Sequence, residues 1–118
     1  MNVPVVMGEW GGLCPKKTDW FSHIDFVYSL IEQNQWSSLY WNYYFENDEF
    51  VRLMNRPYPI AVCGDIISYR TDSNERKFFM EYNVSDDYVL AETQIYVPNK
   101  GVQKFKSNYG INKIEISY

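Results

Sequence analysis

The sequence has few of the residues that bind metal ions. Its 118 residues include only two cysteines and one histidine. Cys14 and Cys63 lack the spacing of a metal site, and only His23 accompanies them. Two partly buried thiols are the favoured interpretation, and a single disulfide between them is the alternative. We therefore expect no metal ion and no cofactor.

Positive charge and long apolar runs are also scarce. The 11 lysines and arginines are outnumbered by 15 acidic residues, which gives a net charge of −4. Because phosphate binding needs a basic surface, this balance argues against a nucleic-acid partner. No run of eighteen apolar residues predicts a transmembrane helix, and the start of the chain does not resemble a signal peptide. Cysteine usage leaves the compartment open.

Aromatic residues, by contrast, are abundant. They make up 19% of the chain, and apolar residues in total make up 46%. This apolar fraction is enough for a packed core and argues against disorder. Aromatic rings bury large areas and also stack on flat ligands such as sugar faces. The length suits one small domain, or pieces of two.

The first part of the chain, to about residue 56, has the pattern strand, helix, strand. The apolar run from Val3 to Met7 predicts a strand buried on both faces. Thr18 is a candidate N-cap, and apolar residues then recur at helical spacing to about Gln35: Trp20, Ile24, Val27, Tyr28 and Ile31. The aromatic-rich stretch 37–43 predicts a second strand. A strand–helix–strand unit of this length implies two parallel strands.

After residue 56 the pattern changes to a period of two. Along 77–84, one predicted strand face carries Phe78, Met80, Tyr82 and Val84. Stretches 93–97 and 114–118 repeat the alternation, and turn residues at 72–75, 85–87 and 99–101 separate such runs. These features predict a small antiparallel β-sandwich with Greek-key or meander connections.

A single strand–helix–strand unit cannot cover both faces of its own strands. Those strands would need further strands and helices to pack against, and the sequence does not supply them. We expect the chain to be the C-terminal part of a larger protein, with Met1 an internal methionine or the start of a truncated gene model. Assembly with a second polypeptide is the alternative.

Glu9 is the candidate catalytic residue. It follows the predicted strand Pro4–Gly8, and Gly8, Gly11 and Gly12 allow the backbone to turn around it. In eightfold βα barrels, catalytic residues lie at the carboxyl ends of strands. An ion pair with a neighbouring cation is the alternative role for this carboxylate.

Trp41 follows the second predicted strand, one crossover further along. We expect its ring beside Glu9, because a carboxylate next to an aromatic platform suits glycoside hydrolysis. Packing inside the barrel is the alternative for Trp41. Tyr40 and Tyr43 are expected to pack against helices. The acidic residues Glu46, Asp48 and Glu49 are predicted to lie in one loop. Their carboxylates are either solvated or in contact with substrate hydroxyls.

Four motifs, in order, resemble family 5 glycoside hydrolases. Val5–Gly11 (VVMGEWG) is similar to the seventh barrel strand, whose terminal glutamate is the nucleophile, and Ser38–Trp41 (SLYW) is similar to the eighth. Arg56–Gly64 (RPYPIAVCG) resembles the junction with the C-terminal sandwich in endoglycoceramidases and related glycosylceramidases, and Glu92–Pro98 (ETQIYVP) resembles a strand of that sandwich.

The resemblance implies an α/β plus all-β architecture: the last βαβ portion of a (β/α)8 TIM barrel at residues 1–56 and an antiparallel β-sandwich at 57–118. It implies a retaining β-glycosidase that acts on glycolipids, with Glu9 as nucleophile and with Trp41, Trp10 and Glu46 as substrate-binding residues. The parent enzyme would be secreted or lysosomal. Peripheral contact with a membrane surface would be compatible with this function.

The second catalytic carboxyl of such enzymes follows an asparagine at the end of the fourth barrel strand. The only Asn-Glu dipeptide here, Asn74-Glu75, falls in a predicted sandwich turn. The resemblance therefore implies a chain that carries the nucleophile without its acid/base and is inactive alone. A non-catalytic carbohydrate-binding or interaction module is the alternative function. The oligomeric state stays open.

Overall fold

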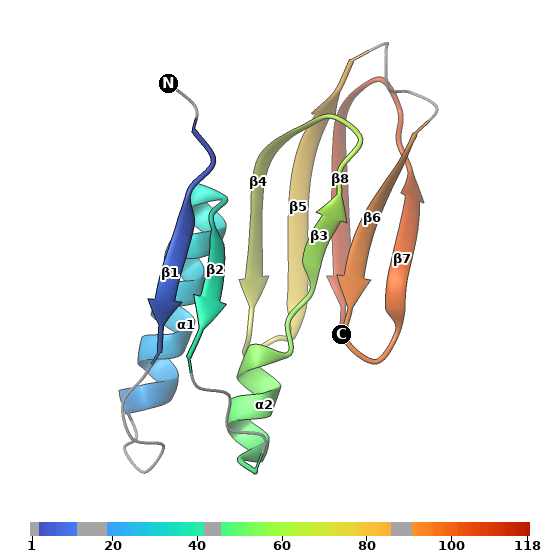
Figure 1. Cartoon of the computed structure of the whole chain (residues 1–118). Helices are drawn as coiled ribbons and strands as arrows, with labels where there is room; N and C mark the ends of the chain where they lie inside the picture. Colours follow the sequence, from blue (N-terminus) through green and yellow to red (C-terminus); the bar gives the residue numbers. More distant parts are fainter. Residues whose placement is uncertain (1–2, 12–18, 42–45, 86–90) are drawn as a thin grey trace. The chain divides into compact units, whose positions relative to one another are not determined.

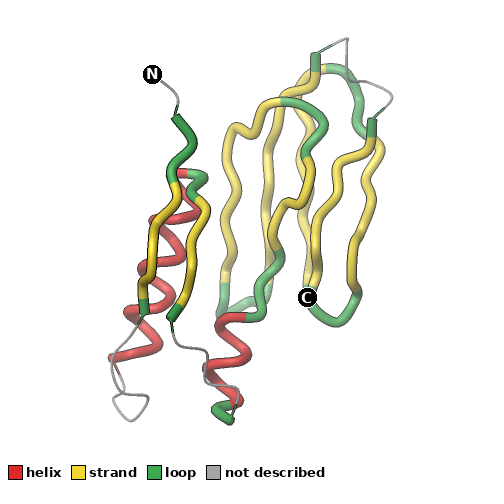
Figure 2. The backbone as a smooth tube through the Cα atoms, viewed as in Figure 1, coloured by secondary structure: helices red, strands yellow, loops and turns green. Residues whose placement is uncertain are grey.

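The structure, a computed structural model, describes residues 3–11, 19–41, 46–85 and 91–118. The described chain forms two compact units, Met1–Asn55 and Arg56–Tyr118. Both helices belong to the first unit, and the second consists of strands and loops (Figure 2). None of the described helices is long and apolar enough to span a membrane.

The first unit is a two-stranded parallel sheet with helices packed beside it (Figure 1). Its elements are β1 (Val6–Trp10), α1 (Asp19–Asn34), β2 (Ser37–Tyr40) and α2 (Asp48–Met54). The predicted parallel pairing through a helical crossover is confirmed. Four residues named in the sequence analysis lie outside the described residues: Gly12, Cys14, Tyr43 and Thr18, the last of which was the proposed N-cap.

The core of this unit lies on the helix side of the sheet. Ile24, Phe50 and Leu53 are its buried residues, and aromatic side chains of α1 and both strands pack around them. Ile24 and Ile31, two members of the predicted helical stripe, are buried. The predicted packing of Tyr40 against helices is confirmed, because its ring lies 5.4 Å from that of Phe50 on α2.

Two predictions for the first strand need correction. The strand runs from Val6 to Trp10 instead of ending at Gly8, because its pairing with β2 continues to Trp10. Val3, Val5 and Val6 were expected to be buried on both faces but are exposed. Val3 and Val5 precede the strand, and Val6 is exposed because α1 covers only one face of the two-stranded sheet.

The second unit is a sandwich of two antiparallel three-stranded sheets. One sheet has the order β3-β6-β7 and the other β4-β5-β8. The strands are β3 (Tyr58–Ala61), β4 (Asp65–Asp72), β5 (Lys77–Val84), β6 (Glu92–Val97), β7 (Gly101–Lys106) and β8 (Gly110–Ser117). The predicted antiparallel sandwich is thereby confirmed for this part of the chain.

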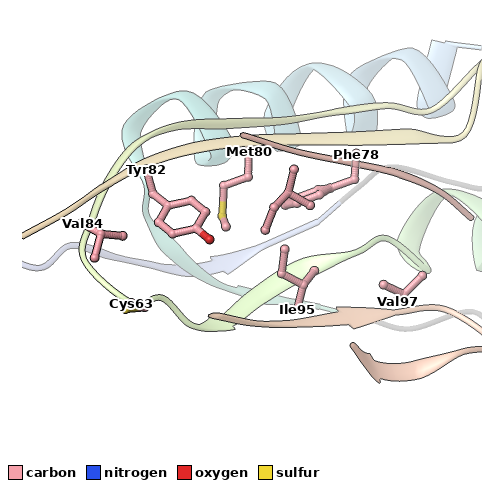
Figure 3. Packing of buried hydrophobic residues seen from close by; sticks show 8 residues of the cluster. Cys63, Phe78, Met80, Tyr82, Val84, Ile95 and Val97 are labelled. Atoms are coloured by element: carbon pink, nitrogen blue, oxygen red, sulfur yellow. The ribbon is translucent and has the colours of Figure 1, made fainter. Parts of the chain in front are cut away.

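The inner faces of the two sheets form one hydrophobic core (Figure 3). β5 contributes the four residues predicted from their alternation, Phe78, Met80, Tyr82 and Val84, and all four are buried. β6 adds Ile95 and Val97, β8 adds Ile114, and Cys63 lies at the edge of the cluster.

Hydroxyl groups buried with this core are hydrogen-bonded to one another. Tyr82 Oη and Ser107 Oγ lie 2.9 Å apart, and Ser107 Oγ lies 3.4 Å from Thr93 Oγ1. The Cys63 backbone N–H donates to Thr93 Oγ1 at 3.0 Å. Because the hydroxyl groups of Tyr82, Thr93 and Ser107 have partners, none of these three groups carries the cost of an unsatisfied polar atom in the interior.

Candidate functional site

Glu9 owes its position to a β-bulge at Gly8. In the pairing of β1 with β2, Met7 faces Ser38 and Glu9 faces Leu39, so Gly8 is an extra residue without a cross-strand partner. Successive residues of β2 alternate between the two faces of the sheet. Ser38 therefore lies on the helix side and Leu39 on the open side. Since Glu9 pairs with Leu39, the bulge moves its carboxylate to the open face.

The open face of the β1–β2 pair is apolar around this carboxylate. Leu39 is 61% exposed and Trp41 is 67% exposed, and Val6 and Glu9 are exposed as well. Trp41 directly follows β2 and lies two residues beyond Leu39, which is the spacing of residues that share one face of a strand. Glu9 and Trp41 thus come from neighbouring parallel strands and reach the same end of the pair.

The two strands approach each other closely just beyond Glu9. The Trp41 backbone N–H donates to the Trp10 carbonyl at 2.8 Å, so the ladder extends past the end of β2. A Cβ atom at Gly11 would collide with the Trp41 carbonyl oxygen, whereas a Cβ atom at Gly8 would meet open space. Position 11 therefore requires glycine, because the two backbones are too close there for a side chain. Position 8 has space for a side chain.

Trp10 lies on the other side of the sheet from Glu9. Its indole packs edge-on against Tyr28 of α1 at 5.2 Å and against Tyr40 of β2 at 4.8 Å between ring centroids. Among the described residues, no group accepts a hydrogen bond from its buried Nε1. The structure brings Trp10 into the packing beneath the strand ends and not to the face that carries Glu9.

The acidic residues after β2 are divided between a loop and a helix. Glu46 is exposed and precedes the helix. Asp48 and Glu49 were predicted to belong to the same loop, but they form the first turn of α2, whose N-cap is Asn47. The Asn47 side chain accepts from the Phe50 backbone N–H at 2.8 Å. Negative charge in the first turn stabilises a helix by interacting with the positive end of its dipole, which accounts for Asp48 and Glu49 at these positions.

Sequence reasoning missed α2 and the role of Leu39. The helix had a detectable signal: an Asn N-cap, two acidic residues and then Phe50 and Leu53 three residues apart on one face. Leu39 could have been placed opposite Glu9 from the alternation between Leu39 and Trp41. Within the described ranges, no group of three or more histidine, cysteine or acidic residues could hold a metal ion.

Solved structures of other proteins share the fold of this chain. The chain's fold matches endo-glycoceramidase II from Rhodococcus sp., in its lactosyl-enzyme intermediate, with a TM-score of 0.72 over 98% of this chain at 18% identity. The iminocyclitol complex of the same protein matches with a TM-score of 0.73 at 19% identity, again over 98% of this chain. The chain spans 33% of the length of both structures.

A second protein shares the fold more distantly. Sterylglucosidase 1 from Cryptococcus neoformans matches with a TM-score of 0.63 at 12% identity, over 85% of this chain and 24% of its own. At these identities the likeness concerns the fold alone. Comparison with curated protein sequences gives no match. The chain therefore shares its fold with part of each of these two proteins.

The family follows from a match to one sequence model. The model for the glycoside hydrolase family 5 C-terminal domain matches residues 56–116, which is more than half of the chain. The chain belongs to this family. The resemblance to family 5 and to endoglycoceramidases drawn from the sequence motifs is thereby confirmed.

Proposed function

We propose that this chain is the C-terminal part of a retaining β-glycosidase that hydrolyses the O-glycosyl bonds of glycolipids, with Glu9 as the nucleophile. The observation that carries the proposal is the bulge at Gly8, which directs Glu9 to the open face of a parallel strand pair. The fold match over 98% of the chain to an endo-glycoceramidase captured as a lactosyl-enzyme intermediate supports it.

In this proposal β1, α1 and β2 are the last βαβ portion of a (β/α)8 TIM barrel. The uncovered apolar side chains of Val6 and Leu39 support this assignment, because barrel strands bury that face against the other strands. The comparison structures are about three times as long as this chain, which leaves room for the remaining barrel elements in the parent protein.

The chemistry assigned to Glu9 is nucleophilic attack on the sugar. One carboxylate oxygen forms a bond to the anomeric carbon while the bond from that carbon to the lipid oxygen breaks. A second carboxyl group, about 5–5.5 Å from the first, gives the leaving oxygen its proton and then takes a proton from the water that releases Glu9. We assign this acid/base to the part of the enzyme outside this chain.

The remaining site residues receive different roles. Trp41 is proposed as the aromatic platform for the sugar, and its 67% exposure supports this role. Glu46, which is also exposed, is proposed to bind substrate hydroxyls. Trp10 was expected to bind substrate directly. Its edge-on packing on the helix side supports an indirect role, in which it holds the strand ends beneath the site.

The parent enzyme tests the assignment of Glu9. In the full-length protein, Glu9→Ala should lower kcat by about 10⁴-fold or more, because loss of a nucleophile removes the covalent step. Added azide should restore turnover and give a product of inverted configuration, since azide replaces the missing carboxylate. As a comparison, Glu46→Gln should cost about tenfold and leave the retained configuration unchanged. Undiminished turnover of Glu9→Ala would show that the motif has been misassigned.

The location of the parent enzyme is a further part of the proposal. A glycolipid substrate fits a secreted or lysosomal enzyme that meets its substrate at a membrane surface. Fractionation of the source cells, with detection of the full-length protein, tests this location. Recovery of the protein only from the cytosol would contradict it.

A further inference from the structure

The outer face of the β3-β6-β7 sheet differs in chemistry from the rest of the sandwich. Thr93, Ile95 and Val97 point into the core, so alternation directs the intervening β6 residues outward. The strand register then fixes their neighbours on β7: Tyr96 faces Val102, Gln94 faces Lys104 and Glu92 faces Lys106. Tyr58 of β3 faces Tyr96 from the other side. We call these seven residues the β7 face.

An apolar row crosses all three strands at one end of the β7 face. The rings of Tyr58 and Tyr96 stack with centroids 5.1 Å apart and an interplanar angle of 30°. Val102 extends the row on the far side of Tyr96. Tyr58 is 53% exposed and Val102 is 49% exposed, and the neighbouring Ile60 is exposed too. Exposed apolar side chains in a continuous row mark an interaction surface more often than isolated ones do.

Lysines occupy the other end of the β7 face. Lys104 lies 3.6 Å from Glu92, and Lys106 has no ion pair among the described residues. Two lysines against one glutamate leave a net charge of +1 on this face, while the whole chain carries −4. Lys100 is not part of this face, because it lies in the turn at the Tyr96–Val102 end and its Nζ donates to the Ser117 carbonyl of β8 at 2.8 Å.

The outer face of the other sheet provides a contrast within the same unit. There, lysines are matched by glutamates: Lys77 lies within 3.6 Å of both Glu75 and Glu115, and Lys113 lies 3.4 Å from Glu81. Phe79, its central aromatic residue, is covered by the Arg70 guanidinium at 4.1 Å. On that surface the positive charges of the lysines are balanced by glutamates. The β7 face instead combines exposed rings with an excess of positive charge.

We propose that the β7 face is the surface by which this protein rests on a bilayer that contains anionic lipid. Tyrosine side chains favour the membrane–water interface, and lysines are attracted to the negative surface potential of anionic headgroups. The inference rests on the proposed function, because an enzyme that removes sugars from glycolipids works where those sugars leave the membrane. Charge complementarity selects anionic lipid over a neutral surface.

The test uses the 118-residue chain and vesicles of phosphatidylcholine with or without phosphatidylserine. The chain should co-sediment with the vesicles that contain phosphatidylserine, and the binding should weaken as salt is added. Lys104→Gln with Lys106→Gln should weaken it about thirtyfold, since each lysine near the surface contributes about 1 kcal/mol. Tyr58→Ser with Tyr96→Ser should weaken it about tenfold.

Two matched controls separate this face from other causes of binding. Lys77→Gln with Lys113→Gln makes the same change in net charge on the opposite sheet and should alter vesicle affinity less than about twofold. Val6→Thr with Leu39→Thr reports on the open face of β1 and β2, and it should also have little effect on vesicle affinity. Circular dichroism of each variant confirms that the sandwich is folded.

Three outcomes would overturn the inference: absence of binding to phosphatidylserine vesicles, equal losses from the two lysine pairs, or loss confined to the Val6 and Leu39 variant. Dimerisation that the Tyr58 and Tyr96 variant abolishes, without vesicle binding, would instead assign the face to a second copy of the chain. Hydrolysis of a soluble β-glycoside by the full-length enzyme is measured separately. Hydrolysis without vesicle binding contradicts this inference alone, whereas failure of hydrolysis contradicts the proposed function.

Discussion

Two glycines near Glu9 act at the residue scale through different physical effects. Gly8 is the extra residue of the bulge, and space for a methyl group exists beside it. Gly11 lies where the β1 backbone passes the Trp41 carbonyl, and a side chain there would collide with that carbonyl. The sequence pattern treats the two as equivalent, but only Gly11 is required by backbone contact.

Alanine substitution distinguishes the two glycines. Gly11→Ala should destabilise the first unit by about 1–3 kcal/mol, because the added methyl group forces the strand ends apart. Amide hydrogen exchange at Trp41, whose N–H donates to Trp10, should accelerate in this variant. Gly8→Ala is the control and should leave that exchange rate nearly unchanged. Similar acceleration in both variants would contradict the contact described at Gly11.

At the scale of elements, the strands that could be predicted are those with an uninterrupted alternation. β5 buries every second residue from Phe78 to Val84, and the sequence shows this directly. β4 was missed because its register shifts between Ile66 and Ser68, which interrupts the period of two. β7 was missed because two of its three outward positions, Lys104 and Lys106, are polar and all three are exposed, as is usual for an edge strand.

Neighbouring phenylalanines on β5 test this account of the core. Phe78 is fully buried between the sheets, whereas Phe79 lies on the outer face. Phe78→Ala should cost about 3–5 kcal/mol, comparable to the roughly 3–9 kcal/mol expected for a unit of this size, and should largely unfold the sandwich. Phe79→Ala should cost about 1 kcal/mol. Urea denaturation followed by circular dichroism measures both, and equal losses would contradict the assignment of faces.

At the scale of the whole molecule, the sequence predicted the antiparallel sandwich and the parallel strand pair but not the position of every site residue. The change from helical spacing to alternation near residue 56 corresponds to the two units, Met1–Asn55 and Arg56–Tyr118. The face of Trp10 could not be predicted, because it depends on a bulge that hydrophobic periodicity does not reveal. The apolar run at Val3–Met7 indicated burial that partners outside this chain would have to provide.

The proposal predicts that the isolated chain does not hydrolyse glycolipids. A missing general acid alone costs about 10²–10⁴ in rate, and the proposed remaining barrel would also supply substrate contacts. A fluorescent glucosylceramide incubated with the purified chain should therefore give no product above the uncatalysed background. The full-length enzyme is the positive control. Hydrolysis by the chain alone would show that its acid/base lies among these 118 residues.

The extra residue at Gly8 also bears on how related sequences should be compared. Which face a strand residue occupies depends on whether an odd or even number of residues separates it from a fixed neighbour. A relative that lacks the residue corresponding to Gly8 would keep both the methionine and the glutamate, yet its glutamate would point toward the helix. Gain or loss of the proposed nucleophile among relatives can therefore arise from a single insertion or deletion, without replacement of the glutamate itself.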